Sequence, residues 1–127
     1  ANNRNIQILV QSFSFSIGYP TGIDMIFDCR FLKNPNWVED LKNLNGTDEA
    51  VQKYLNKDKS WATFKKNLFQ MISVVIPAFE REGKSYLSIG LGCTGGQHRS
   101  VFVAEQLYNY LLDKNCDVKI LHTILQR

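Results

Sequence analysis

The sequence predicts an α/β fold in which a mostly parallel sheet of about four strands is sandwiched by helices in a Rossmann-like arrangement. The chain has 127 residues, which is the length of one ordinary domain. Short segments with strand patterning alternate with longer segments of helical periodicity. Helices of that length favour right-handed crossovers between parallel strands. We therefore expect residues 1–127 to form a single domain.

Two apolar segments near the N-terminus predict the first two strands. Residues 6–15 alternate loosely between apolar and small polar side chains, which is typical of a strand covered on both faces. Turn residues follow at positions 18–22, and residues 25–31 predict a second strand. The sequence Asn34-Pro35-Asn36 then ends that strand.

The middle of the chain predicts two helices. Thr47 or Asp48 can cap the first of them, and Ser60 can cap a longer one whose apolar residues recur at helical spacing. Pro77 is expected to kink the longer helix. A stop is expected at Gly83, because glycine favours the backbone conformation that ends a helix.

The C-terminal third predicts a strand over residues 85–91, an amphipathic helix over residues 99–113 and a last strand over residues 118–121. The expected order is thus β-β-α-α-β-α-β. In such sheets ligands bind beyond the carboxyl ends of the strands, so the loops after Phe31 and Leu91 are where a site is expected. Both tryptophans, Trp37 and Trp61, stand at apolar spacings that predict the core.

Composition limits the classes of function and the location. The formal net charge of +3 allows an anionic partner without requiring one, and the longest apolar stretch is too short to cross a membrane. The first five residues show no secretion signal. Three cysteines, without a C-x-x-C motif, favour reduced thiols. We expect a cytoplasmic domain without a cofactor.

The loop from Gly92 to Ser100 has the composition of an anion cradle. Its three glycines allow the backbone N–H groups to turn inward, and the helix that starts near Arg99 adds the positive end of its dipole. Arg99 offers a planar charged fork for a phosphate. The alternative is a tight turn that simply needs glycine. The candidate ligand contacts are Thr94, Gly95, Gly96, Gln97, His98, Arg99 and Ser100.

A second interpretation of the same loop is catalytic. The pattern C-x-x-G-x-x-R-S from Cys93 to Ser100 matches the loop of cysteine-dependent phosphatases. Cys93 would then be the nucleophile, Arg99 would hold the phosphate oxygens, and Asp28 or Asp24 would be the general acid. Those phosphatases usually carry His where this chain has Gly92, so this interpretation ranks second.

Several motifs spread over nearly the whole chain resemble the C-terminal domain of the RapZ family of RNase adapter proteins. The longest are residues 27–37 and 92–100. Shorter ones are Ser12-Phe13, Leu44-x-Gly46, residues 82–87 and Ala104-Glu105-x-Leu107. The resemblance implies a fold like a phosphofructokinase allosteric domain and a regulatory domain rather than an enzyme. It also implies sensing of an amino-sugar phosphate such as glucosamine-6-phosphate, binding of small regulatory RNA, no membrane association, and homo-oligomers of the full-length protein.

The resemblance also implies where ligand contacts lie and where this chain departs from the family. Asn36, Asp28 and Arg30 are expected at the pocket together with the cradle residues. For Asp28 and Arg30 the alternative is a salt bridge that fixes the loop of residues 31–37. The family commonly carries His where Asn36 stands, and basic or aromatic side chains near the position of Ile17. The tail from residue 121 has a single arginine, so RNA affinity is expected to be weak. No G-x-x-x-x-G-K-S/T motif is present, so nucleotide hydrolysis would belong to a separate P-loop domain.

Overall fold

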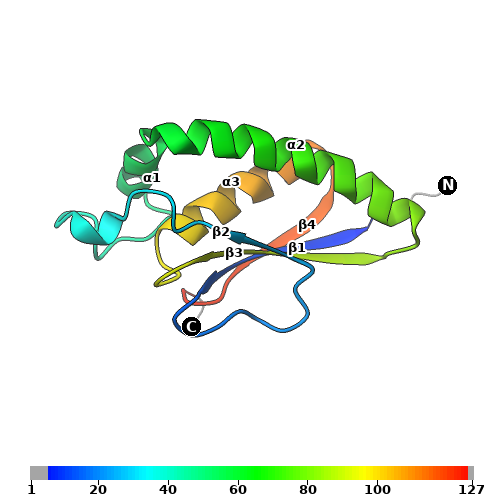
Figure 1. Ribbon diagram of the computed structural model, residues 1–127, viewed down its shortest axis with the longest axis horizontal. Coiled ribbons are helices and arrows are strands. Elements are labelled where there is room, and N and C mark those ends of the chain that lie inside the picture. The colour runs from blue at the N-terminus through cyan, green and yellow to red at the C-terminus, as the bar shows by residue number, and fades with distance from the viewer. Residues whose placement is uncertain (1–5, 126–127) are drawn as a thin grey trace.

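The computed structural model describes residues 6–125 (Figure 1). The five N-terminal residues, where no secretion signal is expected, and the last two residues of the tail lie outside this range. The elements in chain order are β1 (Gln7–Ser14), β2 (Met25–Asp28), the 3-10 helix η1 (Pro35–Trp37), α1 (Glu49–Asn56), α2 (Lys59–Arg81), β3 (Tyr86–Cys93), α3 (Arg99–Asp113) and β4 (Asp117–His122). This order confirms the predicted succession of strands and helices.

The four strands form one sheet in the order β2-β3-β1-β4, and every neighbouring pair is parallel. The predicted α/β class with a four-stranded parallel sheet flanked by helices is therefore confirmed. The two central strands, β1 and β3, are almost completely buried from their second residue onward. This burial explains why their sequences are nearly continuous runs of apolar and small residues.

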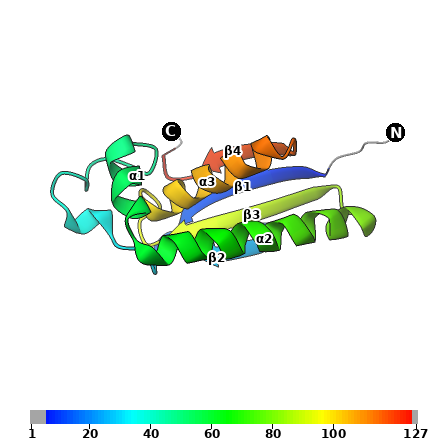
Figure 2. The ribbon, with the colours of Figure 1, turned by 90° about the horizontal axis from the view of Figure 1, so that it is seen from above.

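The direction of each connection explains what covers each face of the sheet. The chain moves across the sheet in one direction from β2 to β3 and from β3 to β4, so right-handed crossovers put α2 and α3 on the same face. From β1 to β2 the chain moves in the opposite direction, so a right-handed connection, residues 15–24, lies on the other face. Figure 1 accordingly shows the helices above the sheet and the loop of residues 15–24 below it, and Figure 2 shows α2 running along the β2–β3 side.

The core lies between the sheet and the helices. Its buried members include Val10 and Ile89 from the central strands, Ile72 from α2, and Phe102 and Leu107 from α3. The other face is closed by side chains of the 15–24 loop and its neighbours, because β3 carries glycines there that leave room for Ile23, Phe13 and Phe15. No helix in the described range is long and apolar enough to cross a membrane.

Three local predictions differ from the structure. The second strand ends at Asp28 rather than at Phe31, because the chain turns away from β3 to build the loop that leads into η1. Asp58, not Ser60, caps α2: its carboxylate accepts the Ser60 N–H at 2.9 Å. Trp61 is buried as predicted, whereas the Trp37 side chain is 83% exposed.

The end of α2 and both bounds of α3 agree with the predictions. The helix continues past Pro77 to Arg81, and Gly83 follows with a φ of 89°, the left-handed conformation that ends helices. The α3 bounds agree with the predicted residues 99–113.

A close approach at Gly46 yields a test of the packing around the start of α3. A Cβ at this position would lie 2.4 Å from the carbonyl oxygen of His98 and 2.5 Å from the backbone nitrogen of Phe102. Because both are backbone atoms, Gly46→Ala must displace the segment, and we expect it to lower the free energy of unfolding by about 1–3 kcal/mol. Urea unfolding followed by circular dichroism measures this difference.

Gly95→Ala is the matched control, since a Cβ at Gly95 meets no atom within 4 Å. It should leave the urea midpoint unchanged. Equal midpoints for wild type and Gly46→Ala would contradict the packing described here.

Candidate functional site

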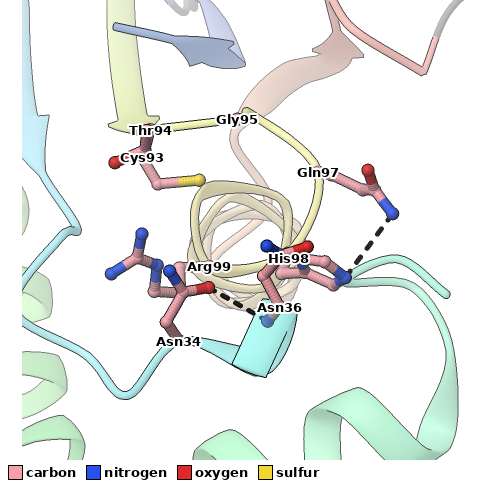
Figure 3. Close-up of a pocket in the computed structure, with 8 residues that line it drawn as sticks. All are labelled: Asn34, Asn36, Cys93, Thr94, Gly95, Gln97, His98 and Arg99. Carbon is pink, nitrogen blue, oxygen red and sulfur yellow. Dashed lines mark hydrogen bonds between the residues drawn. The ribbon is translucent and has the colours of Figure 1, made fainter. Parts of the chain in front are cut away.

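A pocket of about 180 Å³ lies at the carboxyl edge of the sheet, between the β3–α3 loop and η1 (Figure 3). This is the edge where ligands bind in open α/β sheets. Its lining residues are Asn34, Asn36, Cys93, Thr94, Gly95, Gln97, His98 and Arg99. Six of these were predicted contacts, and Cys93 was predicted as the alternative nucleophile. Asn34 was predicted only to end the second strand.

The β3–α3 loop presents backbone donors. The N–H groups of residues 94–98 donate to no acceptor within the described part of the chain. Gly96 makes the loop possible in two ways: its φ is 72°, and a Cβ there would lie 2.6 Å from Cγ1 of Ile124 and 3.0 Å from the backbone of Phe13. The loop thus approaches the ends of β1 and β4 closely, while its N–H groups stay available.

Arg99 connects the two loops that form the pocket. Its side chain is buried, and Nη1 donates to the carbonyl oxygens of Arg30 at 2.9 Å and Leu32 at 3.1 Å. The guanidinium therefore holds the chain segment after β2 against the start of α3. It also lines the pocket, and it carries a permanent positive charge there.

Gln97 and His98 anchor a third segment, residues 41–46. Nε2 of Gln97 donates to the carbonyl oxygens of Leu44 at 2.6 Å and Lys42 at 3.1 Å. Nε2 of His98 lies 3.1 Å from the carbonyl oxygen of Leu41, and it must donate because a carbonyl only accepts. Both side chains thus line the pocket while they hold its outer support in place.

The environment of His98 keeps the imidazole neutral. Burial lowers its pKa, and this effect outweighs the hydrogen bonds to the 41–44 carbonyls, which act in the opposite direction. With the proton on Nε2, Nδ1 is the ring nitrogen that is left as an acceptor.

Cys93 and Ser100 form a contact beneath the cradle. Sγ of Cys93 donates to Oγ of Ser100 at 3.2 Å and accepts the Ser100 N–H at 3.4 Å. Figure 3 shows the sulfur directed toward the first turn of α3. Ser100 is fully buried and does not line the pocket, so its hydroxyl reaches the pocket only through Cys93.

Neither of the acidic candidates, Asp28 and Asp24, is among the residues that line the pocket. Asp28 and Arg30 form an exposed ion pair, with Nη2 of Arg30 2.7 Å from Oδ2 of Asp28, and that hydrogen bond lowers the pKa of Asp28. Neither residue lines the pocket, and the Arg30 guanidinium lies over the ring of Phe15 at 4.2 Å. Asp24 accepts the N–H of Ser88 near the opposite end of β3.

The fold and this polar pocket define an α/β domain with a binding cavity at the carboxyl edge of a parallel sheet. Over residues 6–126 the sequence matches the family described as the RapZ C-terminal domain, and the chain belongs to that family.

Similar proteins carry the name nucleotide-binding protein. One from Cereibacter sphaeroides is 50% identical over 122 residues, which cover 96% of this chain and 40% of the relative. One from Dinoroseobacter shibae is 48% identical over 122 residues, covering 96% of this chain and 41% of the relative. One from Citrifermentans bemidjiense is 44% identical over 117 residues, covering 92% and 41%. The chain thus spans about two-fifths of the length of these curated relatives.

The lowered pKa of His98 predicts a pH dependence of stability. Below a pH of about 6.5 the unfolded chain binds a proton at this residue while the folded protein does not, so the free energy of unfolding falls as the pH falls. His98→Gln keeps an N–H donor but does not titrate. Between a pH of about 7.5 and 5.5, we expect a larger loss of stability in the wild type than in His98→Gln.

Urea unfolding of both proteins across this range makes the comparison, and His122 is common to both and cancels. Parallel losses in the two proteins would show that His98 is not buried in its neutral form.

Proposed function

We propose that this domain is a regulatory sensor that binds a small phosphorylated ligand of the amino-sugar phosphate class, such as glucosamine-6-phosphate, in the pocket at the start of α3. The single observation that carries the proposal is the run of N–H groups at residues 94–98 that have no acceptor among residues 6–125, beside the permanent charge of Arg99. Together they match the oxygens of a phosphate.

The opposite wall suits the rest of such a ligand. Asn34 and Asn36 line the pocket from η1 and its cap, and amide groups can both donate to and accept from sugar hydroxyls. Thr94 adds a hydroxyl on the cradle side. The volume of about 180 Å³ is suited to a compact ligand and small for a drug-sized one.

One observation supports the phosphatase interpretation: Cys93 lines the same pocket as Arg99. The reaction also needs a proton donor for the leaving oxygen. No carboxylate is among the pocket-lining residues of the described range, and Asp28 is paired with Arg30 outside it. Binding without turnover is therefore the better supported function.

RNA binding, cytoplasmic location and assembly into homo-oligomers belong to the same proposal, as properties of a RapZ-type adapter. The adapter family is the support for each of them. For RNA we expect weak, salt-dependent contacts from dispersed basic residues, since only a single arginine, at position 127, stands in the tail from residue 121 and it lies outside the described residues.

Nucleotide binding, which the relatives' names state, is proposed for a separate P-loop domain of the full-length adapter. The sequence of this chain has no P-loop motif, and it covers about two-fifths of those relatives. Residues 1–127 are proposed to act as one domain within that larger protein.

Replacing Arg99 tests the site. Arg99→Ala removes the charge beside the cradle and should weaken binding of glucosamine-6-phosphate by about 2–3 kcal/mol in calorimetric titrations. Because Arg99 also holds the Arg30 and Leu32 carbonyls, Thr94→Val is a second variant, which removes a hydroxyl while conserving the shape. It should weaken binding by about 1 kcal/mol.

Arg30→Ala is the matched control, since it makes the same change in net charge at an exposed site outside the pocket. Its affinity should stay close to that of the wild type. An equal loss of affinity in Arg30→Ala and Arg99→Ala, with Thr94→Val unaffected, would refute the assignment of the site.

Cys93→Ser separates the sensor from the phosphatase. We expect no release of phosphate from p-nitrophenyl phosphate or sugar phosphates by the wild type above the level of the Cys93→Ser protein. Binding should survive the substitution, because the Arg99 charge and the backbone N–H groups remain. Phosphate release that disappears in Cys93→Ser would make the phosphatase interpretation correct.

A further inference from the structure

Two of the three cysteines occupy facing positions on neighbouring strands. Asp28 of β2 is paired with Gly92 of β3 in the parallel register. The Cys29 N–H continues this pattern by donating to the Gly92 carbonyl oxygen at 2.7 Å. Cys29 and Cys93 are the next residues after the Asp28–Gly92 pair, so continuing the register by one position sets Cys29 opposite Cys93.

Both side chains belong to the same side of the sheet. Cys93 follows Leu87, Ile89 and Leu91 at intervals of two residues, and these three are part of the core beneath the helices. Cys29 is fully buried in that same core. Both side chains therefore lie on the core face of the sheet, next to the floor of the pocket that Cys93 lines.

The spacing suits a covalent link. Neighbouring strands lie about 4.8 Å apart, and disulfides join Cα atoms separated by about 4.4–6.8 Å. Burial raises the pKa of Cys29 strongly, and the Cys93 sulfur raises it further. Both are free thiols in this structure.

We propose that Cys29 and Cys93 are a redox-active pair, and that their oxidation by a hydroperoxide to a disulfide controls the pocket. The pocket gives the oxidant access to Cys93, which lines it, whereas Cys29 lies behind it in the core. Cys93 is therefore the thiol that reacts first, and Cys29 is the one that resolves the product.

The chemistry balances with one hydroperoxide. The Cys93 sulfur, after losing its proton, attacks the O–O bond; that bond breaks, Cys93 becomes a sulfenic acid, and the departing oxygen leaves as water or an alcohol after taking up that proton. The Cys29 sulfur then attacks the Cys93 sulfur. The S–O bond breaks, and the hydroxyl leaves as a second water with the proton of the Cys29 thiol. The two thiols lose two electrons, which reduce the hydroperoxide.

The link would change the pocket through residues already described. It removes the Cys93 sulfur from its contacts with the N–H and Oγ of Ser100 at the first turn of α3. It also ties the start of the segment that carries the Arg30 and Leu32 carbonyls directly to the end of β3. This part of the inference rests on the proposed function, and it predicts severalfold weaker ligand binding by the oxidised protein.

The test treats the folded chain with a stoichiometric amount of hydrogen peroxide. The free thiol count should fall from three to one. A peptide map without reductant should show Cys29 joined to Cys93, and dithiothreitol should restore all thiols. Cys116→Ala should form the same link, whereas in Cys29→Ala one equivalent of peroxide should leave Cys93 as the sulfenic acid, and a second equivalent should convert it to the sulfinic acid. Links between chains through Cys116, or unlinked Cys29 in the oxidised wild type, would overturn the pair.

Calorimetry with glucosamine-6-phosphate on the reduced and oxidised forms tests the control of the pocket. Weaker binding by the oxidised form, reversed by dithiothreitol, is the expected result. Equal affinities of the two forms would show that the disulfide does not control the pocket. The peptide map would still decide whether Cys29 and Cys93 form the disulfide. Absence of binding by both forms would overturn the proposed function and this regulatory part with it, again without affecting the map.

Discussion

The pocket depends on the anchoring of three chain segments at the first turn of α3. Arg99 holds the segment after β2 through two carbonyl oxygens, and Gln97 and His98 hold residues 41–46 through three more. Hydrogen bonds from a charged donor contribute about 1.5–3 kcal/mol each and neutral ones about 1 kcal/mol. These side chains thus use much of their own hydrogen-bonding capacity inside the protein, and they leave the backbone N–H groups of the loop for a ligand.

The sheet topology explains why these segments meet. All four strands are parallel, so their carboxyl ends share one edge, where the loops after β2 and β3 approach each other. Gly46 and Gly96 then allow backbone to pack directly against backbone on two sides of the cradle. The site is consequently rigid in its supports, although it is made of loops. These supports hold the N–H donors in position before an anion binds, so binding does not carry the entropy cost of ordering the loop.

Much of this architecture follows from the sequence, because it is carried by periodicity and by local signals. Periodicity predicts the strands and the bounds of α3, and a local signal, Gly83, predicts the end of α2. The roles of Gln97 and His98 could not be derived, since their partners lie more than fifty residues away. The exposure of Trp37 could not be predicted from the sequence either, because it depends on how the short η1 helix packs against the rest of the domain. The place of Asn34 in the pocket lining could not be predicted for the same reason, because Asn34 is the cap of η1.

The proposed function depends on the binding of a phosphate by the N–H groups of residues 94–98. The most direct measurement is a ¹⁵N–¹H correlation spectrum of the chain titrated with glucosamine-6-phosphate, with inorganic phosphate and glucosamine as separate arms. We expect the largest shifts to fall on residues 94–98 with both phosphate-bearing compounds, and glucosamine alone to leave these signals in place. Shifts confined to other parts of the chain, or unmoved 94–98 signals at saturating phosphate ester, would contradict this phosphate binding.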